Sequence, residues 1–353
     1  MILLKDYGYT DFFDNQITEK ETELGLIPAR IISIQKETYR LVSAHGENNA
    51  KLKGSVFYQN NELKTYPAVG DFVLIKANEQ GEDIIYRVLD RHSSFSRANP
   101  SLPAKLSGAS AQIVAANFDY VFVMTSLNHD FNLRRLERYL TAAWQSSGTP
   151  VIILTKADLS GDYEEKIALT KEIAPGVSIH AISCYTGLGL EALSQYLKPG
   201  KTLVFMGSSG IGKSSLVNAL AGKELMKVNL IREDDSKGHH TTTYRQLFAL
   251  ESGALIIDTP GMRELGIWSA DEGVSEVFSD IEDLIASCRF HDCYHKTEPG
   301  CAVRKALADG TLSPARYQSY LKLEKEARFT AKKAALIESR LLNSKNYKNQ
   351  KYR

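Results

Sequence analysis

The stretch that decides the fold is Thr202-Leu203-Val204-Phe205-Met206-Gly207-Ser208-Ser209-Gly210-Ile211-Gly212-Lys213-Ser214-Ser215. Its apolar first part, residues 202–206, predicts a buried strand, and residues 214–220 predict a helix. The glycine-rich spacing between this strand and helix is that of a phosphate-binding loop. The alternative is a Gly/Ser turn without a ligand, which would not require a strand and a helix on its two sides.

Each residue type in the loop has a chemical task. The glycines let backbone N–H groups approach the β-phosphate of a nucleotide. Lys213 can reach the β- and γ-phosphate oxygens, so it is also a candidate catalytic residue, and the Ser214 hydroxyl can bind Mg²⁺. The predicted nucleotide-binding residues here are Gly207, Ser208, Ser209, Gly210, Ile211, Gly212, Lys213, Ser214 and Ser215.

Downstream of the loop, a second apolar run ends in a polar motif. Residues 254–257 predict a strand that leads into Asp258-Thr259-Pro260-Gly261. An aspartate at the carboxyl end of a strand can hold Mg²⁺ through water, so Asp258 is a candidate magnesium ligand. The Gly261 N–H is the candidate contact to the γ-phosphate.

Upstream of the loop, the apolar residues 151–154 end in Thr155-Lys156-Ala157-Asp158, which resembles the guanine-binding motif Asn-Lys-x-Asp. The Asp158 carboxylate can accept hydrogen bonds from the ring N–H and the exocyclic amine of guanine, whereas adenine offers no matching pair of donors. The motif therefore favours GTP over ATP. Thr155 keeps a hydroxyl but lacks the amide of the commoner Asn, a change that affects base affinity more than base identity.

The order of these motifs along the chain is displaced. Residues 181–187 resemble the Ser-Ala-Lys loop that covers the base, with Ser183 and Cys184 as candidate contacts. Numbered one to five in the standard GTPase order, the motifs occur here as four, five, one, two, three, which is a circular permutation. Permutation preserves the site, because ligand loops of an open parallel sheet project from the same carboxyl edge whichever strand comes first.

With the motifs in this order, residues 28–316 resemble the bacterial family of GTPases that depend on the small ribosomal subunit, RsgA, also called YjeQ. The resemblance implies a permuted P-loop GTPase fold, GTP/GDP and Mg²⁺ as ligands, and hydrolysis stimulated by the small (30S) subunit. It also implies a role late in maturation of that subunit, with contacts to 16S rRNA. We expect a monomer.

The polar residues 232–243 are the switch I candidate. Alignment with the family's second motif makes Thr242 the first choice for a Mg²⁺ ligand and Thr241 the next. Met262 occupies the position where many GTPases carry a water-orienting Gln, and its side chain is no useful donor or acceptor, so another group must position the attacking water. His240 is the nearest candidate. It matches the histidine of the family's Arg-His-Thr-Thr, and His239 replaces the arginine.

The region before the GTPase motifs has five short β-rich runs separated by turn signals. They are residues 29–34, 38–42, 51–56, 71–75 and 84–89. Five short strands suggest a small closed barrel, and an oligonucleotide-binding (OB) fold fits this count. A generic β-barrel without a ligand is the alternative. Residues 96–103, with two prolines and no periodicity, predict a linker to the next domain.

Three of the four cysteines gather near the C-terminal end, in the pattern C-x4-C-x-H-x5-C formed by Cys288, Cys293, His295 and Cys301. Three thiolates and one imidazole can close a tetrahedron around a structural Zn²⁺. His291 is the rival imidazole, and His295 is preferred because it matches the family position. Buried thiols beside a chance histidine are the alternative. Short helices are expected at residues 280–287 and 302–308.

Length and composition fit a multidomain soluble protein. The chain has 353 residues and a formal net charge of +1. We predict an acidic N-terminal segment with the barrel (residues 1–97), the α/β GTPase domain (98–266), and a mainly α zinc-binding domain (267–353) with a basic tail. The first residues lack a secretory signal and no apolar run would span a membrane, so a cytoplasmic protein is expected.

Two other functions fit parts of the sequence. A permuted GTPase acting on another ribosomal particle, or a metabolic P-loop enzyme, would share the nucleotide motifs, although we see no acceptor-substrate site. A nucleotide-gated RNA chaperone with negligible turnover would be compatible with Met262.

Overall fold

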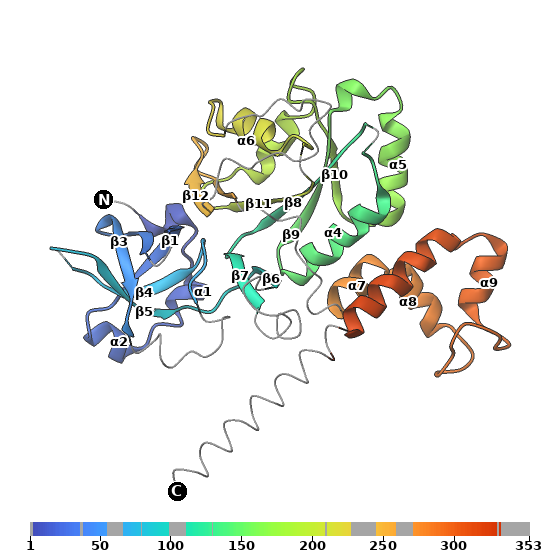
Figure 1. Cartoon of the computed structure of the whole chain (residues 1–353), viewed down its shortest axis with the longest axis horizontal. Helices are drawn as coiled ribbons and strands as arrows, with labels where there is room; N and C mark the ends of the chain where they lie inside the picture. The colour runs from blue at the N-terminus through green and yellow to red at the C-terminus, as the bar shows by residue number, and fades with distance from the viewer. Residues whose placement is uncertain are drawn as a thin grey trace, which may run out of the picture.

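The computed structural model in Figure 1 describes residues 3–35, 38–54, 66–78, 80–98, 111–128, 130–208, 210–226, 245–258, 271–329 and 332. A β-barrel, an α/β region and a helical region follow one another along the chain. Among the described residues, no helix is both long enough and apolar enough to cross a membrane.

The N-terminal barrel has five strands: β1 (Ile27–Gln35), β2 (Thr38–Ser43), β3 (Gly46–Leu52), β4 (Phe72–Lys76) and β5 (Asp83–Val88). The strands pair in the order β1-β2-β3-β5-β4, and β4 pairs back with β1, which closes the barrel. Strands β3 and β5 run parallel, and the other neighbours are antiparallel. The predicted five-stranded barrel is therefore confirmed.

The third strand lies earlier than predicted, at Gly46–Leu52 instead of residues 51–56. Glu47 and Asn49 point to solvent from this strand, and Ala50 alone is buried in it. Because most of its side chains face outward, the strand lacks the apolar alternation by which a half-buried strand is found in a sequence.

The N-terminal segment closes one end of the barrel. It contains the short helices η1 (Leu4–Tyr7), α1 (Asp11–Asp14) and α2 (Glu19–Glu23). Phe13 of α1 is buried, and its ring centroid lies 4.2 Å from that of Phe72 at the start of β4. The aromatic contact buries apolar surface that the barrel end would otherwise expose.

The central region is built on a parallel sheet. Its strands are β8 (Tyr120–Ser126), β9 (Thr149–Thr155), β10 (Ser178–Ala181), β11 (Thr202–Met206) and β13 (Leu255–Asp258), with antiparallel β12 (Arg245–Ala249) beside β13. The order is β10-β9-β8-β11-β13-β12. The helical segments are α4 (Leu133–Gln145), η3 (Ala157–Leu159), α5 (Tyr163–Ile173), η4 (Glu191–Tyr196) and α6 (Lys213–Ala221).

Both faces of this sheet are covered. Alternate residues of β8 belong to different cores: Val121 and Val123 pack in one cluster, and Phe122 and Met124 pack in the other. A strand buried on both faces produces the continuous apolar run that the sequence shows. The predicted α/β architecture is confirmed. Helix α4 covers one face of the sheet, and Asn132 is its N-cap.

The barrel and the α/β region share one sheet. Strand β12 pairs with β13 on one side and with β1 of the barrel on the other, where Ser33 lies opposite Gln246. Arg30 of β1 is fully buried at this junction, and its guanidinium donates to the carbonyls of Gly70 and Asn117 and to the Thr202 hydroxyl. Burial lowers the pKa of Arg30 to about 10. These contacts cross-link the two regions.

The predicted linker begins inside a strand. Strand β6 (Ser94–Ala98) pairs antiparallel with β7 (Ala111–Ala116), so Ser96 lies opposite Ile113. The prediction that residues 96–98 lack regular structure is therefore wrong. Strand β6 is short, and its residues Ser94-Phe95-Ser96-Arg97-Ala98 do not alternate regularly between polar and apolar, so the sequence carries no strand pattern here.

The C-terminal region is helical. It contains α7 (Asp271–Val277), α8 (Ser279–Ala286), α9 (Ala302–Asp309) and a last helix that covers residues 314–329. Helix α4 of the α/β region packs against α7 (Figure 1). The helices expected at residues 280–287 and 302–308 are confirmed within one residue at each end.

Candidate functional site

The loops with the sequence motifs leave the sheet at one edge. Strands β10, β9, β8, β11 and β13 are parallel neighbours, so their carboxyl ends lie together. The motif residues Thr155, Ser183, Gly207 and Asp258 lie at or just beyond these ends. The permuted chain therefore builds one composite site.

The phosphate-binding loop has the backbone that its glycines predict. A side chain at Gly207 would place Cβ 2.1 Å from Ile211 Cδ1 and 2.7 Å from the Met124 carbonyl, so only glycine fits. Gly212 precedes α6 with φ +100°, in the left-handed region, and open space surrounds the position of its missing Cβ. The loop thus presents the start of α6 to an open volume, as anion binding requires.

The guanine motif contacts the phosphate-binding loop directly. The Thr155 hydroxyl donates to the carbonyl of Ile211 at 2.6 Å, and the Lys156 ammonium donates to the carbonyl of Gly210 at 2.9 Å. Thr155 is 2% exposed, so its hydrogen bond is shielded from water. The two motifs lie more than fifty residues apart in the sequence, and these bonds make them parts of one site.

The base side of the site is formed by the loops after β9 and β10. The Ala157 N–H donates to the Ile182 carbonyl at 3.0 Å, which joins the two loops, and Asp158 is exposed beside them. The Ser183 hydroxyl accepts from two backbone N–H groups and shapes the second loop. Burial raises the pKa of the Cys184 thiol, and the nearby charge of Asp158 raises it further. Cys184 and Asp158 therefore lie close enough for the carboxylate to influence the thiol.

The candidate magnesium ligands divide between two parts of the chain. Ser214 lies half-buried in the first turn of α6, directly after Lys213, and Asp258 is half-buried at the end of β13. Both positions belong to the carboxyl edge described above. Ser209, the switch I candidates His239, His240, Thr241 and Thr242, and Gly261 with Met262 lie outside the described residues.

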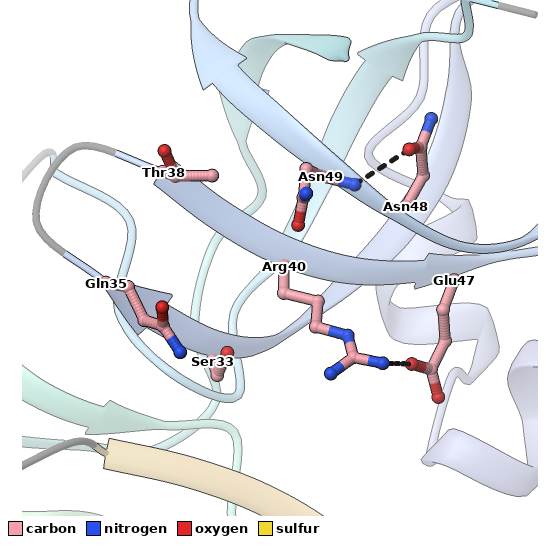
Figure 2. Close-up of a pocket in the computed structure, with 7 residues that line it drawn as sticks. All are labelled: Ser33, Gln35, Thr38, Arg40, Glu47, Asn48 and Asn49. Carbon is pink, nitrogen blue, oxygen red and sulfur yellow. Dashed lines mark hydrogen bonds and ion pairs between the residues drawn. The ribbon is translucent and has the colours of Figure 1, made fainter. Parts of the chain in front are cut away.

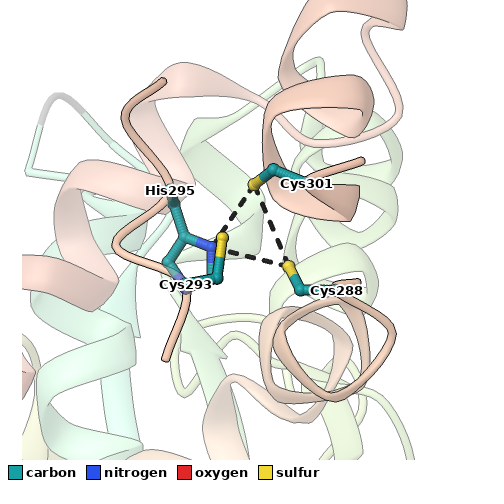
Figure 3. Close-up of side chains that lie close together, drawn as sticks. All are labelled: Cys288, Cys293, His295 and Cys301. Carbon is teal, nitrogen blue, oxygen red and sulfur yellow. Dashed lines mark hydrogen bonds between the residues drawn. The ribbon is translucent and has the colours of Figure 1, made fainter. Parts of the chain in front are cut away.

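A second site lies in the C-terminal region (Figure 3). The site is formed by four side chains that each offer one possible metal-ligand atom. These four atoms, from Cys288, Cys293, His295 and Cys301, all lie within 4.8 Å of one another. Cys288 follows α8, Cys301 is the N-cap of α9, and the other two come from the connecting loop. His291 is not in this group.

The distances suit a tetrahedral zinc site. The Sγ atoms of Cys288 and Cys301 are 3.9 Å apart, and His295 Nδ1 lies 3.6 Å from the first and 3.4 Å from the second. Zinc–sulfur bonds of about 2.3 Å in a tetrahedron place two sulfurs about 3.8 Å apart. His295 has φ 60°, a left-handed backbone that aims its ring into the cluster.

The barrel carries a polar pocket on its outer face (Figure 2). It has a volume of about 410 Å³ and is lined by Ser33, Gln35, Thr38, Arg40, Glu47, Asn48 and Asn49. Ser33, Arg40 and Asn49 are opposite one another across β1, β2 and β3. Arg40 pairs with Glu47 at 2.7 Å. Hydroxyls and amides thus dominate this face.

One residue beside the phosphate-binding loop was absent from the sequence prediction. Ser208 Oγ donates to Asp130 Oδ2 at 3.2 Å, although Asp130 belongs to no motif. It lies in the loop after β8, and only the parallel pairing of β8 with β11 brings it to the site. A charged residue in a loop that follows an apolar strand was its only sequence signal.

The fold and this edge of the sheet define a circularly permuted P-loop GTPase. The family model of the RsgA GTPase matches residues 88–268. The chain belongs to the RsgA GTPase family, and the predicted family and enzyme class are confirmed.

Individual relatives agree with this assignment. The chain is 47% identical over 332 residues to the small ribosomal subunit biogenesis GTPase RsgA 1 of Listeria innocua, covering 94% of this chain and 91% of that protein. It resembles the crystal structure of YjeQ from Thermotoga maritima with a TM-score of 0.63 and 28% identity, over 86% of this chain and 98% of the other. The circularly permuted GTPase YloQ has the same fold, with a TM-score of 0.60 at 24% identity over 86% and 95% of the two chains.

Proposed function

We propose that this protein hydrolyses GTP in the cytoplasm during late maturation of the small (30S) ribosomal subunit, and that it works there as a monomer. The observation that carries the nucleotide assignment is the pair of bonds from Thr155 and Lys156 to the phosphate-binding loop. They unite a guanine motif and a phosphate motif into one site. The ribosomal assignment is supported by relatives such as the Listeria innocua protein, whose name states that role.

The site residues divide the work of binding and catalysis. Lys213 neutralises charge on the β- and γ-phosphates, and backbone N–H groups from Gly207 to Ser215 surround them. Ser214, Thr242 and Asp258 would hold Mg²⁺, which when bound would supply positive charge to the phosphate oxygens. The Gly261 N–H senses the γ-phosphate, and Asp158 selects guanine.

Positioning of the attacking water falls to His240 in this proposal. Met262 stands where an amide side chain would orient water, and its thioether is at best a weak acceptor. An imidazole on the switch I loop can accept a proton from water or orient it. Contact between that loop and the subunit then brings His240 to the attacking water and switches hydrolysis on.

The barrel and the zinc-binding region serve as two arms that contact 16S rRNA. Strands β2 and β3 of an OB-type barrel form the face on which such folds bind single-stranded nucleic acid. The amides and hydroxyls of the pocket in Figure 2 match the polar edges of unstacked bases, and Arg40 matches a backbone phosphate.

Zinc has a structural role in this proposal. Cys288, Cys293, His295 and Cys301 would supply four ligands to Zn²⁺, a complete tetrahedral set that would leave no position for a substrate. The metal supplies folding energy to a loop that contains little apolar material.

GTP turnover measured with purified 30S subunits, large subunits and free rRNA tests the proposal. We expect slow basal hydrolysis, a large increase with the small subunit, and no hydrolysis by Lys213→Ala or Ser214→Ala. Equal stimulation by the large subunit would contradict the partner, and normal turnover in both variants would contradict the site.

A further inference from the structure

The loop between β8 and α4 lies against the phosphate-binding loop and is held by its own polar side chains. Asn128 Oδ1 accepts from the Ser126 hydroxyl at 2.8 Å and from the Asp130 N–H at 3.0 Å. Asn132 Oδ1 accepts from the Arg135 N–H at 3.0 Å and caps α4. These hydrogen bonds fix the described residues of the loop relative to the first turn of α4.

Asp130 connects this helix to the phosphate-binding loop. Its carboxylate accepts from the Ser208 hydroxyl at 3.2 Å on one side. On the other side it forms a two-pronged ion pair with Arg135 of α4, at 3.0 and 2.9 Å. The guanidinium fixes the carboxylate geometrically and offsets its negative charge beside a site for phosphates.

The same turns of α4 are joined to the C-terminal region. Arg316 of the last helix pairs with Glu137 of α4 at 2.9 Å, and the two side chains are only 10% and 3% exposed. Burial raises the pKa of Glu137, whereas its hydrogen bonds and the charge of Arg316 oppose this rise. Arg316 also pairs with Asp280 of α8 at 2.7 Å. Breaking a buried pair of this kind leaves an uncompensated charge, so the contact resists separation.

A second, more exposed pair acts beside the first. Arg138 of α4 pairs with Glu326 of the last helix at 2.8 Å. Arg135, Glu137 and Arg138 lie within one helical turn, where residues rise by about 1.5 Å each. A displacement of the C-terminal helices that pulls on Glu137 therefore moves Arg135 and, through it, Asp130.

From these contacts we propose that α4 transmits the position of the zinc-binding region to the phosphate-binding loop, with Asp130 as the positioning residue that contacts the loop. The connection runs from Arg316 through Glu137, Arg135 and Asp130 to Ser208. It rests on the proposed function, since it regulates the same GTP site. Binding of the zinc region to a partner would then alter how the loop holds the phosphates.

A double-mutant cycle on GTP affinity tests this connection. Arg316→Gln should weaken binding of fluorescent GTP about threefold to tenfold, the range of coupling that distant contacts produce. Ser208→Ala cuts the connection at the loop, so Arg316→Gln in that background should change the affinity less than about twofold. Asp130→Asn should abolish the effect of Arg316→Gln in the same way.

Controls separate the connection from loss of fold. Arg328→Gln removes an ion pair with Glu324 inside the same helix and should leave GTP affinity unchanged. Arg316→Lys keeps the charge and should restore most of the affinity. Zinc content and thermal unfolding are measured for every variant, and Glu137→Gln replaces Arg316→Gln if the latter does not fold.

The outcomes are distinct. Equal weakening by Arg316→Gln with and without Ser208, or no weakening at all, would overturn the proposed connection. Failure of the unchanged protein to bind GTP would overturn the proposed function itself.

Discussion

The Thr155 hydroxyl donates to the backbone carbonyl of Ile211 with an Oγ1–O distance of 2.6 Å. Thr155 occupies the position where the guanine motif most often has Asn, and its side chain is buried. The Thr155 hydroxyl therefore supports the phosphate-binding loop from β9, which is separated from β11 by β8. Thr155 makes this contact although it lacks the amide of Asn.

Replacement of Thr155 tests the value of this brace. Thr155→Val keeps the shape but leaves the Ile211 carbonyl without its donor, at a cost of about 1–3 kcal/mol. We expect GTP and GDP affinity to fall on the order of tenfold, measured by titration with fluorescent nucleotides. Thr155→Ser keeps the hydroxyl and is the matched control. Full affinity in the Val variant would show that the loop needs no brace from β9.

Base selection is tested at Asp158. Asp158→Asn replaces an acceptor with a group that also carries donors, so guanine loses its matched pair of bonds, and GTP affinity should fall on the order of a hundredfold. Competition between GTP and ATP for the unchanged protein is measured alongside. Equal competition by ATP would contradict the guanine assignment.

The zinc site is tested by metal content. Cys293→Ala and His295→Ala should lose the one Zn²⁺ per chain, while His291→Ala, from the same loop, should retain it. Limited proteolysis should then cleave beyond about residue 268, because the metal supplies folding energy to that region alone, and GTP should still be bound. Loss of zinc in His291→Ala with retention in His295→Ala would reassign the fourth ligand.

The polar face of the barrel is tested by a charge. Asn49→Asp places a carboxylate in the pocket of Figure 2 without touching the barrel core, since Asn49 is exposed. Repulsion of RNA phosphates should weaken binding to the 30S subunit about fivefold and more strongly at low salt. Gln195→Glu on η4 makes the same charge change away from the barrel. Equal effects of the two variants would show that the pocket has no special role.

Those parts of the site that are short contiguous motifs could be predicted from the sequence. Gly207 to Ser215 and Thr155 to Asp158 each follow an apolar strand directly, so the motif and its structural context can be read together. Because the strands are parallel, the motifs that follow them lie together at the carboxyl edge of the sheet. The grouping of Cys288, Cys293, His295 and Cys301 was predictable for the same reason, because all four lie in one short segment.

Contacts between distant segments were not predictable. Asp130 reaches Ser208 only because β8 and β11 are neighbours, and Arg30 is buried only because the barrel packs against the sheet. Neither position has a periodicity or a spacing that marks it. Strand β3 lies earlier than the sequence predicts, because its outward polar side chains hide the strand pattern.

The last prediction concerns how hydrolysis is switched on. Met262 cannot orient water as an amide does, so basal turnover should be slow unless another group is brought in. His240→Ala should bind GTP and the small subunit normally yet lose the stimulated rate, because one positioned group contributes about 10²- to 10⁴-fold. His239→Ala, the neighbouring imidazole, is the matched control and should have a milder effect. The measurement is single-turnover hydrolysis with saturating 30S subunits, so that binding and product release do not limit the rate. A stimulated rate that survives in His240→Ala would mean that the backbone or the ribosome positions the attacking water.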